Sequence, residues 1–320
     1  QFSFPKNCKT SRSINMKNNK IPYGKHFIDQ DDIDAVIDVL KNKNLTQGPS
    51  VLSFEKAVAD YVGAKYAVAI SSWTAGLHLA YLVAGLKEGD ELITTPLTFV
   101  ATSNAVLYCG AKPVFSDVDP LTINLCPDKL SRTIKKHPKA KVIAPVHFAG
   151  LACKMKEIKN IADENNLLVI EDAAHALGAK YEDGSMVGNC KYSDMTGFSF
   201  HPVKSIAAGE GGMITTNKKN IYKELLRLRS HGINKGDDDF KNKDLAFTKG
   251  LNNPWYYEMQ ELGYNFRITD IQSALGESQL KKLNKFISRR LEIVKKYDSV
   301  FEDFKYIKPI QLKTRNQSSH

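Results

Sequence analysis

The feature that most constrains the fold of this chain is the alternation of short apolar runs with helix-like segments. Apolar runs typical of buried strands lie at 66–70, 91–95, 113–117, 141–146, 167–170, 195–200 and 212–216. Patterns with helical spacing lie between several of them, such as 31–40, 74–86, 154–165 and 220–230. Strands that alternate with helices indicate an α/β fold, in which helices cover both faces of a mostly parallel sheet.

Two chemically versatile residues directly follow such runs. Asp172 ends the run that starts at Leu167, and Lys204 comes shortly after the apolar Phe198-Ser-Phe segment. Ligands of parallel sheets bind beyond the carboxyl ends of the strands, where both residues are expected. A lysine can form a Schiff base with the aldehyde of pyridoxal phosphate, and a carboxylate can keep the pyridine nitrogen of this cofactor protonated. Taken singly, Asp172 is explained equally well as a helix N-cap, and Lys204 as an exposed residue in a turn.

Other candidate residues each have a simpler structural explanation. The segment Ser71-Ser-Trp-Thr-Ala-Gly joins a strand to a helix and could cradle a phosphate, although N-capping alone explains it better. Phe99 could stack on a ring, but core packing is commoner for an aromatic residue. His175 could contact the same ligand as Asp172 or simply be packed. Asn265 precedes a helical pattern and suits either an anion site or a turn.

Composition and charge exclude several classes of protein. The net charge of +10 is concentrated at residues 1–20 and 305–320, and the nearly neutral body argues against a nucleic-acid-binding face. The five cysteines are scattered without a Cys-x-x-Cys pair, which favours reduced thiols in the cytoplasm and no zinc site or disulfide framework. The histidines show no metal-ligand spacing, so no metal site is expected. No stretch is apolar enough to span a bilayer, and no Gly-x-Gly-x-x-Gly follows a strand, which disfavours a nicotinamide dehydrogenase.

Four motifs occur in a fixed order along the chain. They are Asp172-Ala-Ala-His, Ser199-Phe-His-Pro-Val-Lys, Gly209-Glu-Gly-Gly and Asn265-Phe-Arg. In this combination the chain, from about residue 21 onward, resembles the DegT/DnrJ/EryC1/StrS family of sugar aminotransferases, which depend on pyridoxal phosphate. Segments such as 253–258 and 271–276 resemble most closely the family's transaminases of pseudaminic acid synthesis. The resemblance implies the fold-type-I transferase architecture, with a mostly parallel seven-stranded sheet.

The resemblance also implies a role for each candidate residue. Lys204 would be the Schiff-base lysine and the proton shuttle, and Asp172 would pair with the pyridine nitrogen. His175 would lie near the phenolic oxygen of the cofactor, and Phe99 would stack on its ring. The phosphate would be held by Thr74, Ala75 and Ser199, and Asn265 would reach across to the phosphate of the partner subunit.

The expected activity is the amination of a UDP-linked 4-keto-6-deoxy-HexNAc sugar at C4, with L-glutamate as donor, in a homodimer with shared active sites. The alternative within the family is another 3-amino or 4-amino nucleotide-sugar aminotransferase. Dehydratases of the family carry a histidine in place of the Schiff-base lysine, so Lys204 counts against that reaction. A non-catalytic binding or regulatory relative is the alternative from another class.

The expected organisation has three parts. Residues 1–20 form a basic disordered tail, 21–267 a large pyridoxal-phosphate-binding domain, and 268–320 a linking helix and the incomplete start of a small C-terminal domain. A long helical pattern runs from Ile268 towards Tyr297, and 237–239, with the lysine-containing flank to Lys249, form an exposed loop. The chain is shorter than its family and resembles a C-terminally truncated member. Trp73 stands beside the phosphate cradle, where relatives usually have a small residue.

Overall fold

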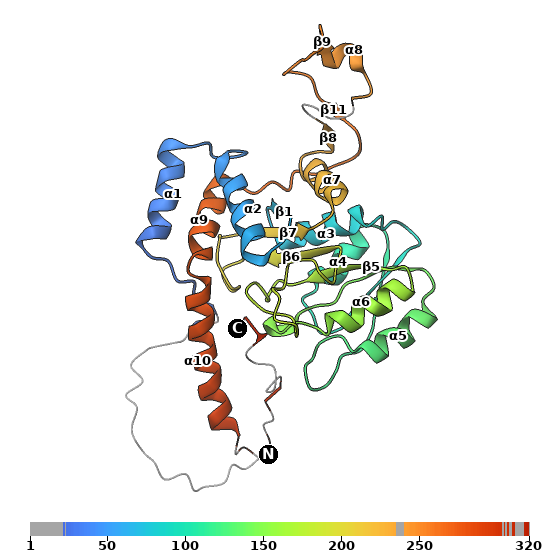
Figure 1. Ribbon diagram of the computed structural model, residues 1–320, viewed down its shortest axis with the longest axis vertical. Coiled ribbons are helices and arrows are strands. Elements are labelled where there is room, and N and C mark those ends of the chain that lie inside the picture. The colour runs from blue at the N-terminus through green and yellow to red at the C-terminus, as the bar shows by residue number, and fades with distance from the viewer. Residues whose placement is uncertain are drawn as a thin grey trace.

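A seven-stranded sheet forms the centre of the computed structural model (Figure 1). The strand order is β1-β7-β6-β5-β4-β2-β3, and β7 runs antiparallel to both of its neighbours while the other pairs are parallel. This arrangement confirms the mostly parallel seven-stranded sheet. The strands are β1 (Tyr66–Ile70), β2 (Glu91–Thr94), β3 (Lys112–Phe115), β4 (Ala140–Ile143), β5 (Leu168–Asp172), β6 (Met195–Ser199) and β7 (Gly212–Thr216).

The structure describes Pro22, 24–234, 240–302, Phe304, Tyr306, Pro309, Ile310 and 317–319. The expected tail at 1–20 and residues 237–239 of the expected loop lie outside these residues. The flank of that loop, from 240 to Lys249, is mostly exposed, but it contains the short helix α8 (Lys243–Ala246) and strand β9 (Phe247–Thr248) and is not a plain loop. Within the described residues, no helix is both long and apolar enough to cross a membrane.

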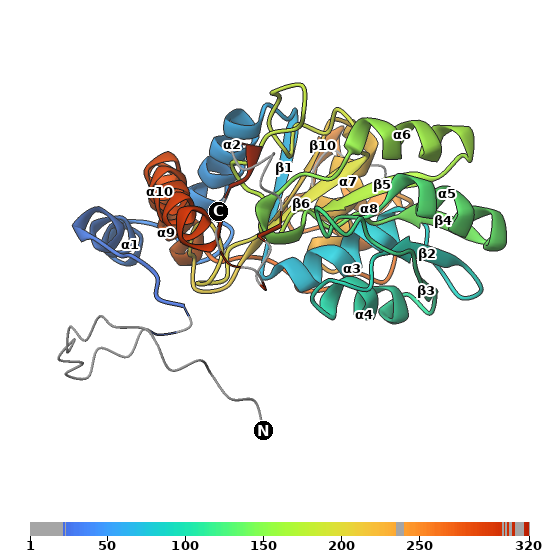
Figure 2. The same ribbon diagram turned by 90° about the horizontal axis from the view of Figure 1, so that it is seen from below.

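Helices cover both faces of the sheet, and a separate hydrophobic core fills each side (Figure 2). Along β1, Val68 and Ile70 enter one core while Ala67 and Ala69 enter the other, as the two-residue period of a strand requires. One core packs against α3 (Trp73–Val83), α4 (Ala101–Tyr108) and α7 (Lys219–Arg229). The other packs against α2 (Pro49–Val62), α5 (Pro127–Lys136), α6 (Met155–Glu164) and α9 (Asp270–Leu280).

The remaining elements lie outside this three-layer body. Helix α1 (Gln30–Asn42) packs beside α9, and α10 (Leu283–Phe301) follows α9 along the edge of the molecule (Figure 1). An arm of short elements stands away from the sheet beyond α7. The short elements are the 3₁₀ turn η1 (Phe148–Gly150) and, in the arm, β8 (Ile233–Asn234), α8 (Lys243–Ala246), β9 (Phe247–Thr248), β10 (Leu251–Asn252) and β11 (Glu258–Met259).

The long helical pattern that starts at Ile268 proves to be two helices. Helix α9 ends at Leu280 and α10 begins at Leu283. Between them, Lys281 and Lys282 form a turn, in which Lys282 has φ of −99° and ψ of −6°. The ammonium group of Lys282 pairs with Asp29 and Asp32, which cap the start of α1. Because only two residues separate the helices, the helical pattern of the sequence does not reveal the break. The domain boundary at 267/268 stays a prediction.

The connection from β6 to β7 carries Lys204 at the carboxyl end of β6. The amide of Phe200 donates to the carbonyl of Gly211, and the carbonyl of Phe200 accepts from the amide of Ala208. The ring of Phe200 packs against the ring of Phe54 on α2, with 5.0 Å between the ring centroids. The loop that presents Lys204 is therefore anchored in the core.

We expect Phe54→Ala to lower the free energy of unfolding by about 3–5 kcal/mol, because it leaves a cavity under Phe200. Phe54 is fully buried, whereas Leu52 on the same helix is 65% exposed. Chemical denaturation followed by circular dichroism measures the change. Leu52→Ala is the matched control and should stay within about 0.5 kcal/mol of the parent chain. Equal effects of the two substitutions would contradict this account of the core.

Candidate active site

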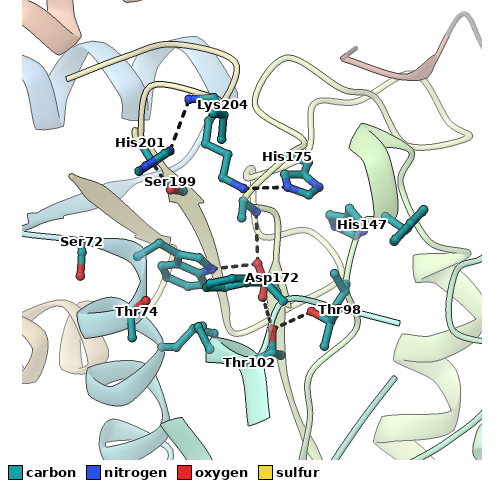
Figure 3. Close-up of a pocket in the computed structure, with 18 of the residues that line it drawn as sticks. Ser72, Thr74, Thr98, Thr102, His147, Asp172, His175, Ser199, His201 and Lys204 are labelled. Carbon is teal, nitrogen blue, oxygen red and sulfur yellow. Dashed lines mark hydrogen bonds between the residues drawn. The ribbon is translucent and has the colours of Figure 1, made fainter. Parts of the chain in front are cut away.

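A cavity of about 740 Å³ opens at the carboxyl ends of β5 and β6 (Figure 3). Strands β5 and β6 pair in parallel with Asp172 opposite Gly197, so the residues that follow each strand meet at one edge of the sheet. The cavity gathers six of the eight residues predicted from the sequence. These are Thr74, Phe99, Asp172, His175, Ser199 and Lys204.

Asp172 is buried, and neutral donors hold its carboxylate. The indole N–H of Trp73 donates to Oδ1 at 2.8 Å, and the hydroxyl of Thr102 donates to Oδ2 at 2.7 Å. The amide of Ala174 also donates to Oδ1, at 3.2 Å. Among the described residues, no basic side chain forms an ion pair with this 4% exposed carboxylate. A buried carboxylate without a cation is costly, so the site favours a ligand that brings a positively charged N–H group.

Lys204 extends its amine into the cavity from the loop after β6. Its Nζ lies 2.8 Å from Nε2 of His175, which belongs to the segment after β5 (Figure 3). Partial burial lowers the pKa of Lys204 below its ordinary value. Burial, and then the neighbouring Lys204 cation, likewise lower the pKa of His175. A lowered pKa leaves more of the lysine as a free amine, the form that reacts with a carbonyl group.

The start of helix α3 forms another wall of the cavity. Ser72 caps the helix, and its hydroxyl accepts from the amide of Ala75 at 3.2 Å. The side chains of Ser72 and Thr74 line the cavity, and Ser199 faces them from the end of β6 (Figure 3). A helix N-terminus with hydroxyl groups on both sides is suited to a phosphate group. Ala75 contributes its backbone to this turn and is not a lining residue.

These features fit the cofactor predicted from the sequence. The ring nitrogen of pyridoxal phosphate would supply the cation that Asp172 lacks, and its aldehyde would meet the amine of Lys204. Phe99, in the segment after β2, lines the mouth of the cavity and is 73% exposed, so its ring is free to cover a flat ligand.

Asn265 lies apart from the cavity. It is exposed and forms a bridge with Ser230 after α7. Its expected role in the phosphate site of a partner subunit is consistent with this position and stays a prediction. Among the described residues, no three His, Cys, Asp or Glu side chains gather to hold a metal ion.

Sequence reasoning identified neither of the two side chains that donate hydrogen bonds to Asp172. Thr102 lies in the first turn of α4, and its hydroxyl is also 2.8 Å from that of Thr98. No motif marks it, since one threonine in a helix is common. Trp73 had been noted only for its size. Its contact with Asp172 joins residues 99 positions apart, which local patterns cannot reveal.

We expect Lys204 to react with acetic anhydride at a lower pH than an unburied lysine, because desolvation lowers its pKa from the ordinary 10.5. Trace labelling across a pH series, followed by peptide mass spectrometry, gives the midpoint for each lysine. Lys65, which is exposed, serves as the internal reference. A midpoint for Lys204 at or above that of Lys65 would contradict the expectation.

The family model of the DegT/DnrJ/EryC1/StrS aminotransferases matches residues 26–320. The chain is 42% identical over 300 residues to the UDP-4-amino-4,6-dideoxy-N-acetyl-beta-L-altrosamine transaminase of Campylobacter jejuni, covering 93% of this chain and 74% of that protein. It is 38% identical over 272 residues to the GDP-perosamine synthase of Caulobacter vibrioides, covering 85% of this chain and 67% of that protein.

The structure is similar to that of PseC from Helicobacter pylori, an aminotransferase of pseudaminic acid biosynthesis. The TM-score is 0.83 at 33% identity, and the match covers 93% of this chain and 75% of that chain. The similarity confirms the expected fold-type-I transferase architecture. With a family model that matches almost the whole sequence, the chain belongs to the DegT/DnrJ/EryC1/StrS aminotransferase family.

Proposed function

We propose that this protein transfers an amino group from L-glutamate to C4 of a UDP-linked 4-keto-6-deoxy-HexNAc sugar, as in pseudaminic acid synthesis. Its broader class is that of aminotransferases that act on nucleotide sugars with pyridoxal phosphate as cofactor. The observation that carries the proposal is the meeting of the Lys204 amine and the buried Asp172 carboxylate in one cavity. The similarity to the Campylobacter jejuni transaminase supports the choice of sugar.

The residues of the cavity have different roles towards the cofactor. When bound, pyridoxal phosphate draws electrons from the carbon that bears the amino group, most strongly with its ring nitrogen protonated. Asp172 would accept the hydrogen bond of that nitrogen and keep its proton in place. The α3 N-terminus and Ser199 would hold the phosphate group, and Phe99 would cover the cofactor ring and limit the access of water.

Lys204 has two tasks in this arrangement. Its amine would hold the cofactor between reactions and, when free, would move a proton to or from the substrate carbon. The contact with His175 keeps the amine beside the cavity, and the lowered pKa keeps part of it unprotonated. The same lysine thus serves both halves of the transfer.

The sugar is the finer part of the proposal, and one relative supports a different choice. The similarity to a protein named GDP-perosamine synthase extends to 85% of this chain, so another 4-amino or 3-amino nucleotide sugar is the second candidate. Incubation with L-glutamate and each keto sugar, with analysis of the products by mass spectrometry and NMR, separates the two. Amination of a GDP-linked sugar alone would overturn the UDP-linked assignment. The cytoplasmic location stays a prediction.

We expect Lys204→Ala to abolish multiple turnover, because no other described lysine lines the cavity. The assay follows 2-oxoglutarate formation with the keto sugar as acceptor. Lys65→Ala removes an exposed lysine and is the control for loss of a positive charge. Sustained turnover by Lys204→Ala would refute its role, and so would reduction with borohydride that fixes the cofactor to a different lysine.

The proposal includes a homodimer with shared active sites. Phe99, which lines the cavity, and its neighbour Val100 are 73% and 57% exposed, and Leu251, Met259 and Leu262 in or next to the arm are 74%, 65% and 76% exposed. Large apolar side chains in such numbers favour a protein partner. Asn265, which forms a bridge with Ser230 at the end of α7 and does not line its own cavity, is the residue that would enter the second site.

We expect Asn265→Ala and Lys204→Ala chains to restore activity when they are unfolded together and refolded as a mixture. In a mixed dimer, one site receives Lys204 from one chain and Asn265 from the other, so it is complete. Each variant refolded alone is the control and should stay impaired. No recovery in a mixture that forms dimers by analytical ultracentrifugation would refute the shared site.

A further inference from the structure

Beside Asp172, an indole ring occupies the wall of the cavity. Trp73 is the first residue of α3, its side chain is 5% exposed, and its N–H reaches Oδ1 of Asp172 at 2.8 Å. The sequence contains two tryptophans, and the other, Trp255, is 66% exposed on the arm. The bulky residue in the cradle is therefore in direct contact with the carboxylate on which the cofactor chemistry depends.

Two glycines make room for this indole. A Cβ atom at Gly197 on β6 would lie 1.6 Å from Cη2 of Trp73, and one at Gly76 on α3 would lie 2.1 Å from Cδ1 of Ile70 and 2.7 Å from Cε3 of Trp73. These distances are far below ordinary contact, so any side chain at position 197 excludes the observed orientation of the indole. The indole is therefore held in a fitted slot between helix and sheet.

The hydrogen bonds around Asp172 leave one position for a ligand. Oδ1 accepts from Trp73 and from the amide of Ala174, whereas Oδ2 accepts from Thr102 alone among the residues that the structure describes. A carboxylate oxygen has two lone pairs, so Oδ2 can accept one more donor. The Trp73 bond at Oδ1 and the Thr102 bond at Oδ2 stop the carboxylate from rotating.

We propose that Trp73 is a positioning residue, which holds Asp172 so that the free lone pair of Oδ2 meets the ring nitrogen of the cofactor. The inference deepens the proposed function and rests on it. Trp73 acts through the orientation of Asp172, while Gly76 and Gly197 keep the indole in place. The opposite possibility is that the indole N–H competes with the ring nitrogen for the carboxylate, and the experiment distinguishes the two by the sign of the effect.

The test is Trp73→Phe, which keeps one aromatic ring in the slot and removes the N–H donor together with the second ring of the indole. We expect the dissociation constant for pyridoxal phosphate to rise by about tenfold or more, the effect of losing a hydrogen bond to a charged group. The ring nitrogen of the bound cofactor should also lose its proton at a lower pH than in the parent chain. The absorption spectrum of the bound cofactor across a pH series follows this change. Trp255→Phe makes the same change on the exposed arm and should alter neither quantity.

Each outcome has a distinct meaning. A parent chain that does not bind pyridoxal phosphate at Lys204 overturns the proposed function and this inference together. If the parent binds and Trp73→Phe binds equally well or more tightly, only the positioning role is overturned, and tighter binding shows competition by the indole. Weaker binding with an unchanged pH profile overturns it as well, because a packing defect alone would produce that result.

A second measurement tests the slot without cofactor. Gly197→Ala should lower the thermal unfolding midpoint sharply in the parent chain, because the new methyl group meets the indole. In a Trp73→Ala background, the same substitution should cost much less, since the space is free. Residues in contact show such non-additive effects, whereas independent ones do not. Additive changes would overturn the fitted slot, and with it the fixed orientation of Trp73.

Discussion

The parallel pairing of β5 with β6 is the constraint on which the rest of this site depends. It sets Asp172 opposite Gly197, so the carboxylate, the indole slot and the loop that carries Lys204 all meet at one edge of the sheet. A shift of one residue would turn every side chain of β6 to the other face. The antiparallel return in β7 then anchors both ends of the Lys204 loop, with Ser199 opposite Gly212.

Two adjacent buried carboxylates at the end of β5 differ in their hydrogen-bond partners. Glu171 points away from the cavity and is fully buried, with His147, Tyr181, Ser193 and Thr196 as hydrogen-bond partners. Its network is complete within the chain. Asp172 points into the cavity with three neutral donors and no cation among the described residues. The strand period of two explains this division, and the incomplete carboxylate is the one left for a ligand.

A tryptophan, Trp73, lies in the predicted phosphate cradle of this chain, beside Asp172. In this chain the indole, Gly76 and Gly197 form one packed unit beneath Asp172. A large residue can enter a close-packed site only where neighbours shrink to receive it. The pair of glycines therefore explains how Trp73 fits at this position. The hydrogen bond to Asp172 connects the indole directly to the cofactor chemistry.

The sequence by itself determined the alternating elements, the sheet class and the strand ends at Asp172 and near Lys204, because periodicity and apolar runs are local properties of the chain. The family motifs added the identity of six residues that prove to share one cavity. Only the tertiary structure decided that α9 and α10 separate at Lys282, that Asn265 lies apart from the cavity, and that Trp73 and Thr102 hold Asp172. These features join residues distant in sequence, and their geometry follows from packing, which no local pattern records.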